Sequence, residues 1–144
     1  MGSSQSINKI NFEDIQTIIR EQKHILINTL DITEQSCLIP YTIAPHDEVD
    51  TLNNLLKYNK KNTRIIIYGK NSNDEKIYSK YNQLINLGFY NIFLYTGGLF
   101  EWLMLQDIYG FDDFPTTKKE LDFLKYKSNK KLDVRFLQYS DNDE

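Results

Sequence analysis

The chain has 144 residues, 40% of them hydrophobic and 13% aromatic, which is enough apolar material for the core of one domain and too little for two. Its formal net charge is -3, and lysines and carboxylates are mixed along the sequence, so no basic stripe is available to neutralise a phosphate backbone and nucleic acid is not an expected partner. A single cysteine, Cys37, excludes an internal disulfide and a thiolate metal site built by this chain alone, and it favours a reducing, cytoplasmic location.

The first half of the chain predicts a helix, two strands and a second helix. Asn11 is suited to cap the first helix, because apolar residues at helical spacing follow it: Phe12, Ile15, Ile18 and Ile19. Two continuous apolar runs of strand length come next, His24 to Leu30 and Cys37 to Ile43, and both predict buried strands. The second helix is predicted over Asp47 to Tyr58, where leucines lie on one face.

The second half alternates strands with helices in the same way. Its predicted elements are a strand over Arg64 to Tyr68, a polar loop, a helix from about Asp74 to Leu87, a strand over Asn91 to Tyr95 and a helix over Leu99 to Tyr109. Gly88 is placed to end the longer helix as a C-cap glycine. This alternation predicts an α/β fold with a mostly parallel central sheet of about five strands and helices on both faces.

Beyond Gly110 the sequence predicts a short helical extension. Thr117 and Glu120 have capping-box spacing ahead of an apolar stretch that contains Leu121 and Phe123. We therefore expect three parts in the chain: a flexible N-terminal segment over residues 1–6, a domain with a helical extension over residues 7–128, and an extension with an acidic tail over residues 129–144.

Three features, in this order, resemble the rhodanese-like (Cdc25-like) family. Ile25 to Asn28 sits where that family has an apolar strand ending in aspartate, and Leu38 to Ile43 resembles its isoleucine-proline-glycine-alanine element. Arg64 to Trp102 resembles the second half of the family, including its Gly97-Gly98 pair. The resemblance covers roughly residues 7 to 110 and implies one rhodanese-like domain.

The loop that follows the third predicted strand departs from the active members of that family. The resemblance implies a nucleophilic cysteine where this chain has Gly69, and the chemistry of those members needs a thiolate there. The loop of this chain consists of Gly69, Lys70, Asn71, Ser72, Asn73, Asp74 and Glu75. We expect Asp74 and Glu75 to cap the next helix themselves and to repel an incoming anion.

Two further positions depart from the family. Asn28 replaces its usual aspartate, and Leu30 stands where an arginine commonly follows. The resulting prediction is a pseudoenzyme, with no catalytic residue, cofactor or metal, that serves as a protein-interaction or scaffolding module. Its protein partner is unidentified by the sequence.

Two other functions are open at the level of the sequence. The chain is an active sulfurtransferase or phosphatase of the same fold if Cys37 is a relocated nucleophile, although a cysteine that opens an apolar strand is more often buried and structural. Alternatively, the amides of Gly69 to Asn73 bind an anion with help from Lys70. His24 and His46 form no convincing metal cluster and are expected at the surface or at helix caps.

The aromatic residues near Gly97-Gly98 have two readings. The glycine pair is expected to form a tight turn that packs Trp102 into the core. The alternative is a partly exposed apolar patch that serves as a partner surface, built from Phe100, Trp102, Tyr109, Phe111 and Phe114.

The first six residues match the N-myristoylation pattern, with Gly2 exposed after removal of Met1 and Ser6 at the preferred position. Chance and an expression-tag leader produce the same start. A single myristoyl chain gives only weak, reversible membrane association. The start of the chain lacks the features of a signal peptide, so we expect a cytoplasmic protein, with a membrane face or a virion as alternatives. Similar chains occur among large DNA viruses and protists, and the heavy use of Asn, Ile, Lys and Tyr is compatible with a viral source.

Overall fold

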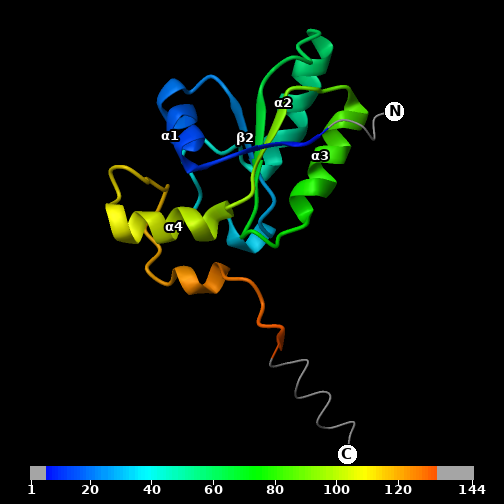
Figure 1. The fold of residues 1–144 in the computed structure, drawn as a ribbon. Coiled ribbons are helices and arrows are strands. Elements are labelled where there is room, and N and C mark those ends of the chain that lie inside the picture. Colours follow the sequence, from blue (N-terminus) through cyan, green and yellow to red (C-terminus); the bar gives the residue numbers. More distant parts are fainter. Residues whose placement is uncertain (1–5, 133–144) are drawn as a thin grey trace, which may run out of the picture.

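Four parallel strands form the centre of the computed structural model, which describes residues 6–132 (Figure 1). The strands are β1 (Asn8–Ile10), β2 (Ile25–Asn28), β3 (Ile65–Tyr68) and β4 (Ile92–Tyr95). They lie in the order β1-β4-β3-β2, so β3 and β4 are central and the other two are edges. Because parallel neighbours need crossover connections, a helix follows each of the strands before the next one is reached or the sheet is complete.

The helices cover both faces of the sheet. Their bounds are α1 (Phe12–Glu21), α2 (Pro45–Lys57), α3 (Lys76–Leu87) and α4 (Gly98–Tyr109), with short 3-10 helices η2 (Ile32–Glu34) and η3 (Phe123–Tyr126). Successive residues of β3 point to opposite faces. Ile66 and Tyr68 pack in one core cluster with α1 and α4, whereas Ile65 and Ile67 pack in the other with α2 and α3. The predicted α/β fold with helices on both faces is confirmed.

Local capping signals explain where two of the helices begin and end. The side chain of Asn11 accepts a hydrogen bond from the backbone N–H of Asp14 at 3.1 Å, and Asp14 Oδ2 accepts one from the N–H of Asn11 at 3.0 Å. At the other end of α3, Gly88 adopts the left-handed conformation with φ of 109°. Both of these capping predictions are confirmed.

The predicted strand over Cys37 to Ile43 is wrong. This segment contributes only an isolated bridge between Thr42 and Leu26. Pro40 has no N–H to donate, and Tyr41 has a φ of 69°, which turns the chain out of an extended path. The backbone N–H groups of the segment instead reach side chains: Leu38 donates to Thr117 Oγ1 and Ile39 to the hydroxyl of Tyr68.

A short strand that the sequence did not predict lies at the other edge of the sheet. β1 pairs in parallel with β4, and its register places Asn8 opposite Phe93 and Ile10 opposite Tyr95. Within the described part of the chain the sheet therefore has four strands, fewer than the expected five or so. In residues 6–132 no helix has both the length and the apolar character needed to cross a membrane.

The segment after α4 folds back on the domain, but not through the predicted capping box. Thr117 Oγ1 accepts from Leu38, and the carboxylate of Glu120 accepts from Lys125 and from the N–H of Asp122. The only helical turn here is η3, which begins at Phe123, later than the capping box requires. The segment is held to α4 by Trp102, whose Nε1 donates to the carbonyl of Pro115 at 2.8 Å.

Candidate functional site

The loop between β3 and α3 lies at the carboxyl edge of the parallel strands, where side chains from several elements meet. A hollow of about 230 Å³ opens above it. Its walls come from the end of β2, from η2, from the loop and from the chain after η3; they are Thr29, Leu30, Asp31, Glu34, Lys70, Asn71, Asn73, Asp74, Lys76, Lys127, Ser128, Asn129 and Lys131. The carboxyl ends of parallel strands are the usual place for a functional site in an open α/β sheet.

Gly69 follows β3 directly, and the start of α4 fixes its backbone. The carbonyl of Gly69 accepts from the N–H of Leu99, and the carbonyl of Lys70 accepts from the N–H of Phe100, both at 2.9 Å. This close approach requires Gly98, which has a φ of 73° and where a Cβ atom would lie 2.9 Å from the carbonyl oxygen of Gly69. The glycine pair thus forms the expected tight turn, and its second member lets α4 touch the loop.

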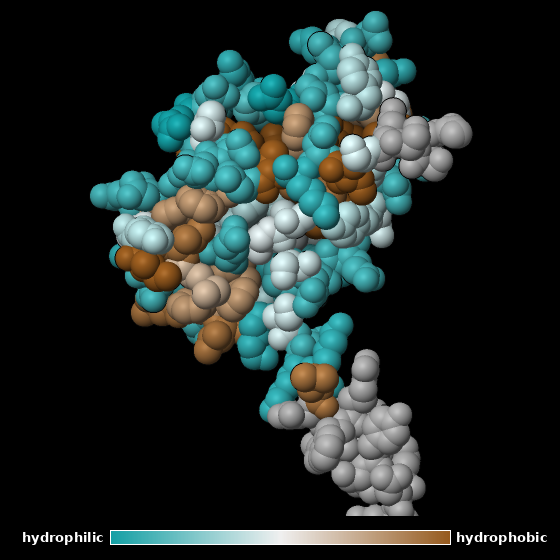
Figure 2. Space-filling view, viewed as in Figure 1, coloured by the Kyte–Doolittle hydropathy of each residue, from teal (hydrophilic) through white to brown (hydrophobic). Residues whose placement is uncertain are grey.

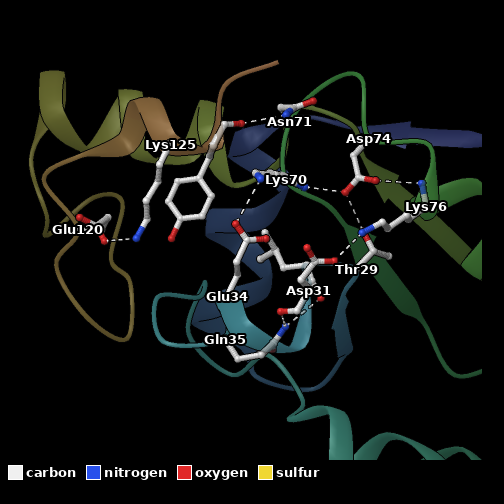
Figure 3. A network of polar contacts seen from close by, with 12 residues as sticks. Thr29, Asp31, Glu34, Gln35, Lys70, Asn71, Asp74, Lys76, Glu120 and Lys125 are labelled. Carbon is white, nitrogen blue, oxygen red and sulfur yellow. Dashed lines mark hydrogen bonds and ion pairs between the residues drawn. The ribbon is translucent and has the colours of Figure 1, made fainter. Parts of the chain in front are cut away.

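The carboxylate of Asp74 fills the inside of the loop (Figure 3). Its Oδ2 atom accepts from the N–H of Lys70 at 2.9 Å and from Oγ1 of Thr29 at 3.0 Å, and its Oδ1 atom accepts from the N–H of Lys76 at 2.9 Å. A Cβ atom at Gly69 would lie 2.3 Å from Oδ2 of Asp74. The carboxylate therefore stands where a side chain at position 69 would begin, and it takes loop N–H groups that an external anion would need.

Only one of the two acidic residues behaves in this way. The sequence placed both Asp74 and Glu75 in the first turn of the helix, but α3 begins at Lys76 and both residues precede it. Glu75 is the N-cap residue, and its side chain makes no cap hydrogen bond. The hydrogen-bonding part of the expectation holds for Asp74 alone.

Asn71 locks the loop from behind. Its side chain is buried, with 8% exposure, and its Nδ2 donates to the carbonyl of Tyr126 in η3 at 2.9 Å. Its Oδ1 accepts from the N–H of Asn73, and its carbonyl accepts from the N–H of Asp74. Buried amide groups with several partners hold a backbone in one geometry. Ser72, in contrast, is exposed and lies beside α4.

The lysines at the rim of the hollow pair with acidic residues of the β2–α2 connection. Lys70 Nζ lies 3.2 Å from Glu34, and Lys76 Nζ lies 2.8 Å from Asp31 (Figure 3). The hydrogen bond from Lys76 lowers the pKa of Asp31, and the same bond raises the pKa of Lys76. The positive charge that an anion would seek at this rim is largely compensated by neighbouring carboxylates.

At the end of β2, the two positions that depart from the family are part of an uncharged network. Asn28 is buried, with 8% exposure; its Nδ2 donates to Gln35 at 3.0 Å, and its Oδ1 accepts from Gln35 at 2.9 Å. Oδ1 also accepts from the N–H of Leu30, whose own side chain joins the core. The side chains at positions 28 and 30 thus satisfy or bury themselves and present no charge to the hollow.

Cys37 does not reach this hollow. It is 1% exposed in the core next to α4, and its Sγ donates to the carbonyl of Lys118 at 3.1 Å. Burial raises the pKa of its thiol, so the reactive thiolate is disfavoured. The structural role expected for Cys37 agrees with this position.

The two histidines lie apart from the loop. His46 is exposed and lies 3.5 Å from Asp47, as expected for a surface residue. His24 is not at the surface: its side chain is only 7% exposed and bonds to Glu21 at 2.9 Å, and this bond lowers the pKa of Glu21. Between residues 6 and 132, no group of three or more histidines, cysteines and carboxylates is arranged to hold a metal ion.

The sequence identified the loop but missed the residues that hold it. Thr29, Gln35 and Tyr126 contribute hydrogen bonds to Asp74, Asn28 and Asn71 respectively. No spacing rule links Asn71 with Tyr126, which is 55 residues away. The predicted lipidation site, Gly2, lies outside the described residues.

The chain is similar to one protein family and to solved structures. Residues 14–105 match the family model for the rhodanese-like domain. The crystal structure of the Alr3790 protein from Anabaena sp. is 21% identical, with a TM-score of 0.56 and 94% of each chain covered. The solution structure of the rhodanese-like domain from that Anabaena protein is 18% identical, with a TM-score of 0.50, covering 88% of this chain and 95% of that one. These two similarities concern the fold alone. No curated protein sequence matches the chain.

Proposed function

We propose, from the premise that this chain belongs to the rhodanese-like domain family, that it is a non-catalytic member that acts by binding a protein partner. The observation that carries this proposal is the carboxylate of Asp74, which occupies the space that a side chain at Gly69 would enter. A nucleophile at that position is absent from the sequence, and the loop N–H groups that would face an anion are hydrogen-bonded inside the chain.

The chemical reason is that sulfur transfer and phosphate cleavage in this fold both need a thiolate and a place for negative charge. A thiolate accepts sulfane sulfur or attacks phosphorus because it is soft and has a lowered pKa. In this chain the only thiol, Cys37, is buried with a raised pKa. Asp74 also places a fixed negative charge in the loop, which opposes the approach of thiosulfate or a phosphoester.

An active sulfurtransferase or phosphatase is the competing function, and Cys37 is its only candidate nucleophile. An anion-binding module is a further alternative. Lys70 would have to leave Glu34, 3.2 Å away, to serve it, and the N–H of Lys70 would have to leave Asp74. Both alternatives thus require contacts of the loop to break before a ligand binds.

The test is a thiosulfate-to-cyanide sulfurtransferase assay, run beside phosphatase substrates on the full chain and on Cys37→Ser. We expect no turnover from either protein. Turnover that disappears in Cys37→Ser would overturn the proposal, because it would identify a working nucleophile outside the loop. Turnover that survives in Cys37→Ser would also overturn it.

Attachment of a myristoyl chain to Gly2 is a separate proposal that rests on the sequence motif alone. It would add weak, reversible binding to a membrane face, in the cytoplasm or in a virion. Metabolic labelling with a myristate analogue should mark the parent chain and not Gly2→Ala. An unlabelled parent chain would rule the modification out in the cell that is tested.

A further inference from the structure

The outer face of α4 is an apolar surface that the described part of the chain leaves uncovered. Leu99, Trp102 and Leu103 on the inner face are at most 1% exposed. On the outer face, Met104 is 39% exposed and Ile108 is 65% exposed. A helix that is apolar all around its circumference is normally buried on every side. The exposed half of α4 is therefore the exception that needs a partner.

These exposed residues gather into one groove rather than lying scattered. The groove has a volume of about 320 Å³ and is lined by Ser72, Gly97, Phe100, Glu101, Met104, Leu105 and Ile108. In Figure 2, brown and tan atoms collect at the lower left, over α4 and the segment that follows it. Contiguous apolar surface of this kind marks interaction sites, whereas single exposed apolar residues do not.

The charges beside the groove are all of one sign. Glu101 lines the groove, and Asp107 is exposed three residues after Met104, which makes it a neighbour on the helix surface. α4 contains no lysine, arginine or histidine. The apolar strip is thus bordered by carboxylates along the helix that forms it.

This charge pattern separates the classes of molecule that can cover the groove. A second copy of the chain would bring Glu101 and Asp107 of one α4 against the same residues of another, and like charges at an interface are unfavourable. An anionic lipid surface would meet the same repulsion. A cationic helix would gain attraction at both borders, and its apolar side chains would enter the groove between them.

We propose that the outer face of α4 docks a cationic amphipathic helix of a protein partner. From Phe100 to Ile108 the groove extends about 12 Å along α4, which matches two turns of a helix with apolar residues at positions i, i+3 or i+4, and i+7. Lysines or arginines that flank those residues face Glu101 and Asp107. This inference deepens the proposed function and rests on it, since it names the class of partner of a binding module.

The experiment uses the full chain and a defined probe. The probe is a fluorescein-labelled, 18-residue peptide with leucines on one helical face and lysines on the other, and binding is followed by fluorescence anisotropy. We expect Ile108→Ser to weaken binding by about tenfold and Asp107→Lys by about fivefold, as for a central apolar contact and a border charge. A matched peptide with glutamate in place of lysine should bind at least about tenfold more weakly.

Two matched controls lie on α2, on the other side of the sheet. Val49 is 64% exposed, almost the same as Ile108, and Asp50 is exposed like Asp107. Val49→Ser and Asp50→Lys should change the dissociation constant by less than about twofold. Thermal unfolding of all four variants checks that each is folded before binding is compared.

Four results would overturn the proposal: no binding of the lysine peptide, equal weakening by the α2 controls, equal binding of the glutamate peptide, or loss of binding in none of the variants. Sedimentation that shows a dimer lost in Ile108→Ser would assign the face to a second copy instead. Association with phosphatidylserine vesicles lost in that variant would assign it to lipid. Each of these results leaves the sulfurtransferase assay unaffected, so failure here is distinguishable from failure of the non-catalytic proposal.

Discussion

The loop after β3 and the outer face of α4 lie next to each other but differ in how far their groups are satisfied. In the loop, the carboxylate of Asp74 accepts three hydrogen bonds and the amide of Asn71 is buried against η3. On α4, Met104 and Ile108 are exposed without apolar cover from the described residues. The first region has little capacity left for a ligand, and the second has apolar surface that only a partner would bury.

One helix connects the two regions. The amino end of α4 donates the N–H groups of Leu99 and Phe100 to the loop, while its outer face continues away from the loop as the groove. The contrast teaches that in this chain α4 supports the carboxyl edge of the sheet with one end and offers binding surface along its length. A change of partner surface on α4 can therefore leave the loop intact, and this separation is what the following predictions test.

The largest effect is expected where α4 meets the loop. Gly98→Ala would combine a left-handed φ of 73° with a Cβ atom 2.9 Å from the backbone N of Asn71, and neither backbone can move independently. We expect a loss of about 3 kcal/mol in the free energy of unfolding, measured by urea denaturation. Gly88→Ala is the control, because its φ is 109° but its Cβ would meet only the flexible side chain of Lys61. An equal loss in both variants would mean that the conformation of the backbone, and not the contact between α4 and the loop, sets the cost.

A second, smaller effect is expected when a cysteine is returned to the loop. In Gly69→Cys the new side chain would displace the carboxylate of Asp74, 2.3 Å from its Cβ atom, and we expect a loss of about 2 kcal/mol. We also expect no sulfurtransferase activity, because the loop N–H groups must first lose their carboxylate.

The double variant Gly69→Cys/Asp74→Ala tests whether these two positions compete for one space. Adding the cysteine in the Asp74→Ala background should cost at least about 1 kcal/mol less than adding it to the parent chain. Additive effects of the two substitutions would contradict the overlap of their side chains.

Removal of the carboxylate alone should open the loop. Asp74→Ala leaves the N–H groups of Lys70 and Lys76 without their acceptor, and we expect a loss of about 1–2 kcal/mol. Sulfate should then raise the melting temperature of the variant and not that of the parent chain, because the freed N–H groups face an anion. Glu75→Ala, which removes no cap hydrogen bond, should change neither quantity. A sulfate response in the parent chain would mean that the loop is open without any substitution.

A hydroxyl beneath the loop should make stability depend on high pH. Tyr68 directly precedes Gly69; its hydroxyl accepts from the N–H of Ile39 at 3.2 Å and bonds to Thr42 at 2.8 Å. Burial raises the pKa of Tyr68 above its ordinary value of 10.0, so the folded state holds this proton after the unfolded chain has released it. The stability contributed by this group is complete below pH 10 and falls as the pH rises above it.

Tyr68→Phe should therefore cost about 1 kcal/mol at neutral pH and flatten the decline above pH 10. The measurement is urea denaturation at several values between pH 8 and 11. An unchanged slope would contradict a buried, protonated Tyr68 hydroxyl. Tyr95 also has a raised pKa, from burial and then from its bond to Glu101, so a residual slope is expected in the variant.

The sequence predicted the central part of the fold because its elements are strongly patterned. The runs that became β2, β3 and β4 are continuous and apolar, as buried parallel strands require. The run from Cys37 to Ile43 is equally apolar, and periodicity cannot distinguish a strand from a buried turn of similar length. β1 was missed for the opposite reason, since Asn8 and Lys9 are exposed and polar and only three residues pair.

The candidate site was predicted in position but not in mechanism. Resemblance to a family located Gly69, and the acidic residues after it suggested capping. The separate behaviour of Asp74 and Glu75 depends on where α3 begins, a boundary that propensities do not fix to one residue. The patch of aromatic residues expected near α4 was partly wrong, because Trp102 and Phe114 are buried and Tyr109 alone of its members is 63% exposed. Side-chain direction on a helix decides this, and it follows only from packing.

The smallest expected effect separates binding surface from folding surface. Ile108→Ser removes an apolar side chain that is 65% exposed, so little area is returned to water and the free energy of unfolding should change by less than about 0.5 kcal/mol. Val49→Ser, at 64% exposure on α2, should give the same small change, measured by urea denaturation. A loss above about 1 kcal/mol in Ile108→Ser alone would mean that residues of this chain cover the face, and the groove would then belong to the fold. If both losses are small while only Ile108→Ser weakens the cationic peptide, the outer face of α4 serves a partner and contributes little to the stability of the domain.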